Sequence, residues 1–264
     1  MYLHSINKVL SHIEPYGLKD LKNANLMNRV DSKFLLPVSG LANILTQLQH
    51  SYRVLEINGQ RISNYNNQYY DTLPMKFYHD HHNGKLSRFK VRHRQYVDTQ
   101  TSFLEVKHKT NQGRTHKTRI NIANDLSQSP VADDFIFDSV GIPLKEMQVS
   151  QYSGYQRIAL ANEETAERLT IDFNLWYALD LNYKIKLPNI CIAELKQARK
   201  SKDSPFYSLQ ENTPMSPLSF SKYCIGCALL HQTEIKSNRF KPTLNKLSNM
   251  LQQYNSINTH LHTI

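Results

Sequence analysis

The 264-residue sequence is poor in cysteine, and this excludes a disulfide-stapled scaffold. It has three cysteines, Cys191, Cys224 and Cys227, whereas small secreted domains need several bridges. The Cys-x-x-Cys spacing at 224–227 matches half of a zinc or redox site. Because no second cysteine pair accompanies it, we interpret these two residues as partly buried helix cysteines. A reducing, cytoplasmic location is therefore expected.

Long hydrophobic runs are also missing. No uninterrupted apolar stretch approaches the roughly 20 residues that span a bilayer. The opening Met1-Tyr2-Leu3-His4 does not begin the basic and then apolar pattern of a secretory signal. We expect no transmembrane segment, and the sequence is compatible with a membrane protein as a partner.

Acidic residues are too few to balance the basic ones. The 32 Lys and Arg stand against 22 Asp and Glu, giving a formal net charge of +10 with neutral histidines. This excess favours an anionic partner such as nucleic acid, a membrane surface or a phosphorylated small molecule. The tyrosines and Trp176 could stack on bases. They alternate with apolar residues instead of standing among the Arg and Lys, so core packing is favoured and nucleic acid is not expected as a partner.

In place of these features, the sequence has rows of ions on predicted strands. In Phe103–Lys109, Glu105, Lys107 and Lys109 share one strand face, because successive side chains point to opposite faces. The same alternation recurs in segments 29–33, 90–94, 168–172 and 193–196. Like charges side by side weaken a sheet, but an enclosed polyanion and a divalent cation would neutralise them. One such strand is more simply a solvated edge; five favour an ionic lumen.

The other patterns predict antiparallel strands surrounded by helices. Strands are expected at 29–36, 85–96, 102–110, 115–122, 147–161, 169–174 and 190–196, and a hairpin is expected from 52–57 and 62–70 around Asn58-Gly59. Helical spacing occurs at 6–13, 41–48, 75–80, 133–140, 221–231 and 244–254, and Ser204-Pro205 resembles a helix start. Short connections favour a meander over βαβ units. No low-complexity linker divides the chain, so we predict a single domain, 1–264, with a core at about 25–230, an N-terminal helix at 2–14 and a C-terminal helical tail at about 241–256.

Taken in order, several motifs resemble those of the VTC catalytic domain. This family makes inorganic polyphosphate and belongs to the triphosphate tunnel metalloenzymes of the CYTH-like superfamily. The motifs are the run from Arg29 to Lys33, Tyr-Tyr-Asp-Thr at 69–72, Lys-Val-Arg-His-Arg-Gln-Tyr at 90–96, Phe-Leu-Glu-Val-Lys at 103–107, Tyr-Gln-Arg at 155–157, Arg-Leu-Thr-Ile-Asp at 168–172, Glu-Leu-Lys at 194–196 and Ser-Lys-Tyr at 221–223. The resemblance implies an α+β fold: an antiparallel β-barrel tunnel with helices packed outside and at its ends.

Carried over residue by residue, the resemblance also implies a site. The catalytic, phosphate-aligning residues would be Lys33, Arg92, Arg94, Lys107, Arg157, Arg168 and Lys196. Further phosphate or polyphosphate contacts are implied at Arg29, Lys90, Lys109, Lys117, Arg119 and Lys222, the last at one tunnel mouth. Glu194 would be the principal ligand of Mn²⁺ or Mg²⁺, with Glu105 nearby as a ligand or an orienting group.

The implied partners are ATP and inorganic polyphosphate. The terminal phosphate of a growing chain would attack the γ-phosphorus of ATP and ADP would leave, with charge stabilisation as the main catalytic effect. With water as the acceptor the same site would be a triphosphatase, and without chemistry it would be a polyphosphate-binding module. Hydrolytic relatives carry Glu-x-Glu-x-Lys, whereas this chain has Phe103, which favours the polymerase. Glu105 and Glu194 argue against binding alone, since carboxylates repel phosphate unless a cation lies between them.

Overall fold

The computed structural model describes residues 2–24, 29–122, 126, 129–209 and 215–261. The expected start of the core, at residues 25–28, lies outside the described residues. In the part that is described, eleven strands join one mixed but mainly antiparallel sheet. They are β1 (Pro15–Tyr16), β2 (Val30–Pro37), β3 (Arg53–Leu55), β4 (Ser63–Thr72), β5 (Arg88–Tyr96), β6 (Thr101–Lys109), β7 (Thr115–Asn121), β8 (Met147–Asn162), β9 (Glu167–Ala178), β10 (Ile185–Leu187) and β11 (Ile190–Gln197).

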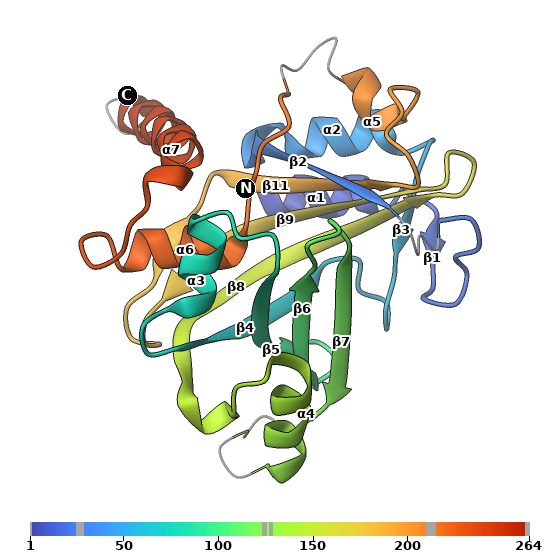
Figure 1. Cartoon of the computed structure of the whole chain (residues 1–264). Helices are drawn as coiled ribbons and strands as arrows, with labels where there is room; N and C mark the ends of the chain where they lie inside the picture. Colours follow the sequence, from blue (N-terminus) through green and yellow to red (C-terminus); the bar gives the residue numbers. More distant parts are fainter. Residues whose placement is uncertain (1, 25–28, 123–125, 127–128, 210–214, 262–264) are drawn as a thin grey trace.

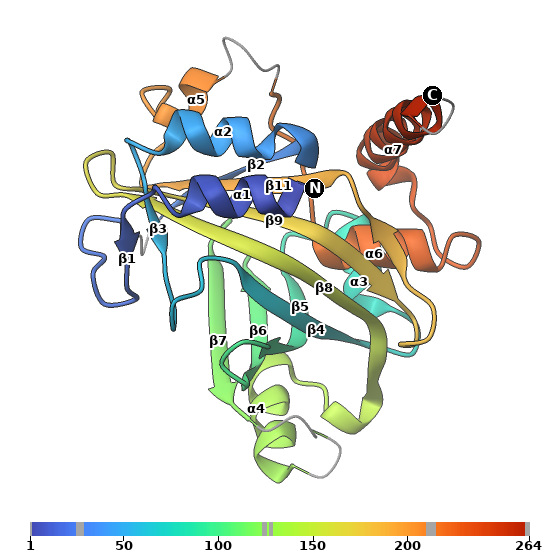
Figure 2. The ribbon, with the colours of Figure 1, turned by 180° about the vertical axis from the view of Figure 1, so that it is seen from behind.

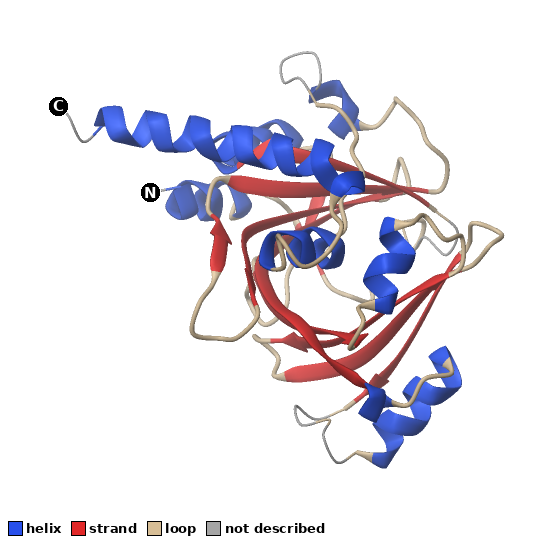
Figure 3. Ribbon diagram, turned by 60° about the vertical axis from the view of Figure 1, so that its left-hand side comes forward, coloured by secondary structure: helices blue, strands red, loops and turns tan. Residues whose placement is uncertain are grey.

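The sheet curves into a tunnel. Its main path runs β2-β11-β9-β8-β4-β5-β6-β7, and the strands bend around a common space (Figures 1 and 3). Within the described residues the two ends of this path, β2 and β7, are not paired with each other. The predicted antiparallel tunnel fold is confirmed, with one open seam.

Helices cover the outside of the sheet and one end of the tunnel. They are α1 (Tyr2–Leu10), α2 (Leu41–Leu48), α3 (Lys76–His82), α4 (Pro130–Val140), α5 (Pro205–Ser208), α6 (Lys222–Leu230) and α7 (Lys241–Leu261). Figure 2 shows α1 and α2 lying across the back of β2, β9 and β11. No helix in the described ranges is both long and apolar enough to cross a membrane.

Successive side chains along a strand point alternately to the apolar core under the outer helices and to the concave face of the sheet. On β11, Cys191, Ala193 and Leu195 are fully buried against the outer helices. Glu194 and Lys196 therefore point to the opposite face. The outer cluster includes Leu41, Ile44, Leu45 and Leu48, the apolar stripe predicted for the second helix.

Helix α6 closes one end of the curved sheet. Its N-cap, Ser221, accepts a hydrogen bond from the Cys224 backbone N–H. Gln151 of β8 donates to the Tyr223 carbonyl at 3.1 Å, and the Tyr223 ring stacks on Tyr69 of β4, with centroids 5.2 Å apart. These contacts fix the first turn of α6, and hence Lys222, against the sheet.

The predicted hairpin between 52–57 and 62–70 is wrong. Asn58 and Gly59 do form a turn with positive φ angles of 51° and 77°, and Ile57 and Gln60 exchange both backbone hydrogen bonds. Beyond that turn the two arms separate: β3 pairs with β1 and β8, whereas β4 pairs with β5 and β8. The long partners β5 and β8 outcompete the local pairing because they offer β4 many more ladder hydrogen bonds.

Candidate active site

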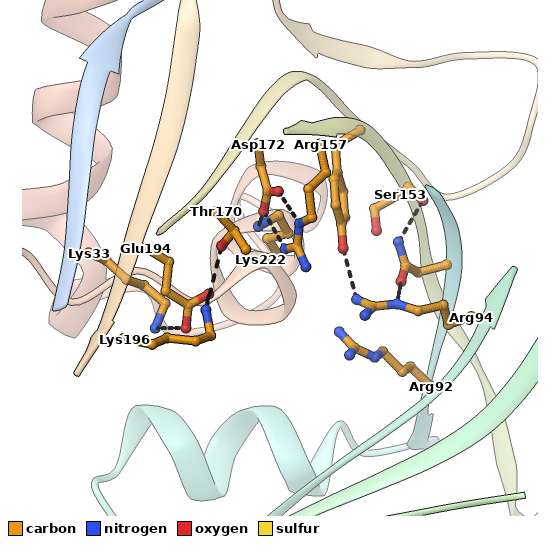
Figure 4. A network of polar contacts seen from close by, with 12 residues as sticks. Lys33, Arg92, Arg94, Ser153, Arg157, Thr170, Asp172, Glu194, Lys196 and Lys222 are labelled. Atoms are coloured by element: carbon orange, nitrogen blue, oxygen red, sulfur yellow. Dashed lines mark hydrogen bonds and ion pairs between the residues drawn. The ribbon is translucent and has the colours of Figure 1, made fainter. Parts of the chain in front are cut away.

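A first cluster joins β2 and β11 on the concave face. Glu194 faces Lys33 across the β2–β11 pair and contacts the Lys33 and Lys196 Nζ atoms at 3.3 and 3.2 Å (Figure 4). Burial opposes the charge of Glu194, yet Lys196 and Lys33 hold the pKa of this carboxyl well below its ordinary value. Burial also lowers the pKa of Lys196 to about 8. The cluster is a carboxylate set between two ammonium groups.

A second cluster lies on the neighbouring strands β8 and β9. Asp172 accepts two hydrogen bonds from Arg157, at 2.5 and 2.8 Å, and a third from the Lys222 Nζ at the start of α6. The Asp172 side chain is only 2% exposed. Burial would raise the pKa of its carboxyl, but Arg157 and Lys222 lower it to about 2. Asp172 therefore stays ionised and orients two cations.

A third cluster lies on the opposite wall. Glu105 of β6 accepts from Arg92 of β5 at 2.6 and 2.7 Å and from Lys117 of β7 at 2.5 Å. Burial would raise the pKa of Glu105, but Arg92, Arg94 and Lys117 lower it to about 2. Both carboxylate oxygens are thus occupied by protein cations, and Glu105 acts here as the anchor of Arg92 and Lys117.

Arg94 is held without a carboxylate. Its Nε donates to the Asn67 side-chain oxygen at 3.0 Å, and its Nη2 donates to the Tyr155 hydroxyl at 2.8 Å. The residue is 6% exposed. Figure 4 shows Arg92 and Arg94 pointing from one wall toward the space that Lys196, Arg157 and Lys222 border from the other.

Two lysines on the same face form no ion pair with any described residue. Lys90 and Lys107 are adjacent across the β5–β6 pair, and neither lies within 4 Å of a carboxylate oxygen in the described ranges. Burial and the charges of Lys107 and Lys33 lower the pKa of Lys90 to about 8, and burial with Lys33 also lowers that of Lys107. Glu194 and Asp31 offset only part of this effect at Lys107, so an anion bound between the two lysines would be stabilised.

The remaining predicted residues lie toward strand ends and edges. Arg29 precedes β2 and pairs with Asp31 at 3.1 Å, and Lys109 ends β6. Arg119, on the edge strand β7, lies 4.5 Å over the Phe103 ring. Arg168 of β9 has a buried Nε with no hydrogen-bond partner in the described structure. The structure thus brings together Lys33, Lys90, Arg92, Arg94, Glu105, Lys107, Lys117, Arg157, Glu194, Lys196 and Lys222, and places Arg29, Lys109, Arg119 and Arg168 around them.

Of the three carboxylates on the concave face, Glu194 is the one best suited to bind a divalent cation. Among the described residues no three His, Cys, Asp or Glu side chains gather into a metal-binding group. Mg²⁺ is nevertheless commonly bound by one or two carboxylates together with substrate phosphates and water. Glu194 suits this role because its contacts to lysine are long and its side chain is 18% exposed, whereas Asp172 and Glu105 are 2% exposed and fully engaged.

Sequence reasoning missed three residues that shape this site. Asp172, Asn67 and Tyr155 fix Arg157, Lys222 and Arg94 through the bonds given above. Asp172 and Tyr155 both lie in motifs that the sequence offered. The role of Asp172 follows only from the pairing register, which sets Arg157 directly opposite it.

Solved structures of other proteins are similar to this chain. A proposed adenylyl cyclase from Hippeastrum, described as having a dominant triphosphatase activity, matches with a TM-score of 0.52 and 14% identity over 77% of this chain and 97% of its own. A proposed adenylate cyclase from Bacillus halodurans matches with a TM-score of 0.48 and 14% identity over 74% of this chain and 94% of its own. At such identities the likeness concerns the fold alone.

Sequence comparison is more specific. The search of curated proteins found no match, but the sequence profile of the VTC domain matches residues 28–136 and 142–231. The matched segments contain all three ionic clusters and the first turn of α6. With most of its length matched, the chain belongs to the VTC domain family, and its fold is that of the triphosphate tunnel proteins.

Proposed function

We propose that this chain is a metal-dependent phosphotransferase that adds the γ-phosphate of ATP to a growing inorganic polyphosphate chain and releases ADP. The observation that carries the proposal is the excess of cations on the concave face. Six basic side chains are held by Glu105, Asp172 and Glu194 in the contacts described above. Within the described ranges Lys90 and Lys107 form no ion pair, and the hydrogen bonds of Arg94 go to the neutral groups of Asn67 and Tyr155. A linear polyanion matches that surplus.

The fixed cations would align the triphosphate. Arg94 and Arg157 are pre-oriented by their partners, so little side-chain entropy is lost when they bind phosphate oxygens. Arginine offers a planar pair of donors, whereas lysine acts as a point charge. In the transfer, a terminal oxygen of the acceptor chain forms a bond to the γ-phosphorus and the bond to the β–γ bridging oxygen breaks. ADP leaves with that electron pair, and the surrounding cations stabilise the charge that develops.

Glu194 would hold the metal. When bound, Mn²⁺ or Mg²⁺ would neutralise phosphate oxygens that the lysines leave uncovered. The carboxylate would then serve to bring a cation into a wall that is otherwise basic. This role explains why a phosphate-binding surface keeps a partly accessible carboxylate at its centre.

Phe103 supports polymerase over triphosphatase. Its ring lies on the concave face, beneath Arg119 and edge-on to Tyr96, with centroids 5.8 Å apart. An aromatic ring here offers no acceptor for a nucleophilic water or a second metal. Hydrolysis of a triphosphate, the activity described for the Hippeastrum protein, is the second candidate. The cytoplasmic location and a membrane partner remain predictions.

An assay with ATP and Mn²⁺ tests the proposal directly. ADP and free phosphate are quantified while the products are separated on a polyphosphate-staining gel. We expect ADP in excess of free phosphate, together with polymer. Equal amounts of ADP and phosphate without polymer would instead establish the triphosphatase, and tight polyphosphate binding without turnover would establish a binding module.

The Glu194→Gln variant separates chemistry from binding. It should abolish turnover and leave polyphosphate binding intact or tighter, because a negative charge is removed from the basic wall. Glu14→Gln is the matched control, since the Glu14 side chain is 72% exposed and pairs with Arg53 outside the site. Loss of folding in Glu194→Gln, judged by circular dichroism, would assign Glu194 a structural role.

A further inference from the structure

A cavity of about 380 Å³ lies on the opposite side of the sheet from the ionic clusters. Asn67 and Arg94 point to the tunnel, where they bond each other. Their neighbours along β4 and β5 therefore face outward, and among these Gln68, His93 and Gln95 line the cavity. Most of this lining belongs to the convex face, and Asn67 of β4, whose side chain bonds Arg94 in the tunnel, also borders the cavity.

The floor of the cavity carries planar hydrogen-bonding groups with spare capacity. Asn66 and Gln95 are cross-strand neighbours, as are Gln68 and His93. Asn66 donates weakly to the Gln95 oxygen at 3.4 Å, and the Gln68 oxygen accepts from Tyr70 at 3.0 Å. The amide nitrogens of Gln68 and Gln95 make no hydrogen bond within the described ranges, so two donors remain for a ligand.

His93 provides a second, independent sign of a ligand. The residue is 3% exposed, and its Nε2 is buried without a hydrogen-bond partner in the described structure. A buried polar atom left unpaired destabilises the folded state. The ring also interacts with the Ile122 backbone. His93 lines the cavity, so a ligand that reaches the ring could pair with its Nε2.

The walls are aromatic, with a cation at one side. Trp176 packs so closely on the backbone of Gly154 that a Cβ there would lie 2.4 Å from the indole Nε1. The Lys184 Nζ lies 4.2 Å from the centroid of the Trp176 ring. The indole therefore has little free face on which a sugar ring could stack, while Lys184 offers a charge to an anionic group.

We propose that this outer cavity binds a nucleotide, with the base among the carboxamides and His93 and the phosphate on Lys184. Carboxamides pair with the hydrogen-bonding edges of planar bases through matched donors and acceptors. The volume is within the range of small-ligand sites. This site does not depend on the reaction in the tunnel.

The chain offers its own reporter, because Trp176 is the single tryptophan and it lines the cavity. The tunnel is first saturated with tripolyphosphate, and AMP, adenosine and glucose are then titrated while tryptophan fluorescence is recorded, with calorimetry as a second readout. We expect saturable binding of AMP and weaker binding of adenosine. Gln95→Leu should weaken both by about tenfold or more, as expected for a lost base contact.

Two lysines give a matched pair of variants. Lys184→Ala should weaken AMP binding and leave adenosine binding unchanged, whereas Lys186→Ala, in the adjacent strand β10 and outside the cavity lining, should change neither. AMP binding that tripolyphosphate abolishes would place the nucleotide in the tunnel and overturn the proposal. Equal binding of glucose would overturn the assignment to a base, and absence of binding by both readouts would overturn the site.

Discussion

Arg157 and Asp172 form a two-point ion pair across β8 and β9, with N···O distances of 2.5 and 2.8 Å. The same carboxylate also holds Lys222, which arrives from α6 at the end of the sheet. One acidic residue thus sets the positions of two cations that come from different layers of the fold. The predictions below concern this ion pair and the other charged and aromatic side chains on the concave face.

Asp172→Ala should destabilise the protein and make its stability depend on ligand. Arg157 and Lys222 would stay enclosed without a counter-ion, and removing one partner of a buried pair costs about 3–5 kcal/mol. Tripolyphosphate should then raise the free energy of unfolding more in the variant than in the native chain, because its charges replace the carboxylate. Urea unfolding with and without tripolyphosphate measures both effects. Asp134→Ala, at an exposed position of α4, is the control, and an equal ligand effect in the native chain and Asp172→Ala would contradict the assignment.

Alkaline pH should stabilise the ligand-free protein while weakening its hold on triphosphate. The pKa values of Lys90 and Lys196 fall to about 8 in the folded state, chiefly through burial, from an ordinary value of 10.5. Between these values the unfolded chain binds more protons, so the free energy of unfolding rises with pH in that window. Over the same pH range these lysines lose their protons, and with them the positive charge that is proposed to bind phosphate.

Tripolyphosphate titrations at pH 7, 8 and 9, paired with unfolding curves, test these opposite slopes. Lys90→Met should flatten both of them. A tripolyphosphate affinity that does not change across this range would show that these lysines do not contact the anion.

Arg94 should contribute to affinity through its orientation as well as its charge. Arg94→Ala removes a charge-assisted hydrogen bond and should weaken ATP binding by ~1.5–3 kcal/mol. Arg94→Lys keeps the charge but loses the simultaneous contacts to Asn67 and Tyr155, so only part of the affinity should return. Calorimetry with ATP gives the comparison. The control is Arg114→Ala, at an exposed position in the β6–β7 turn; full recovery by lysine would mean that charge alone matters.

Phe103→Glu should shift the products toward free phosphate. The substitution places a carboxylate on the concave face beside Arg94, its cross-strand neighbour, and Arg119, where it could orient water. The ratio of phosphate to ADP, measured with ATP and Mn²⁺, should rise while total ADP release is retained. Phe103→Leu controls for loss of the ring, and an unchanged ratio in Phe103→Glu would remove position 103 as a determinant of the acceptor.

The ionic rows and the order of the strands were predictable because both are local properties. Alternation with a period of two fixes which side chains share a face, whatever strand lies alongside. This is why Glu105 with Lys107 and Glu194 with Lys196 could be assigned to one lining. Helix α6 was equally local, with its Ser221 cap and its apolar residues.

Features that depend on distant partners could not be predicted. The Asn58-Gly59 turn is present as expected, but the segments on its two sides pair with other strands and not with each other. Asn174 adopts a φ of 51° beside the register shift in the β8–β9 pair, which changes the alternation midway along β9. The outer cavity also required knowledge of how the segment carrying Lys184 folds back over Trp176.

The open seam of the tunnel also affects how the protein behaves in solution. Strand β7 pairs only with β6 in the described structure, so one row of its backbone groups is free to join a strand of another chain. Charged side chains on an edge strand oppose such joining. β7 presents Lys117 and Arg119, both exposed, so two copies approaching edge to edge repel each other. We therefore expect the cations proposed to bind phosphate on this wall to oppose edge-to-edge association as well.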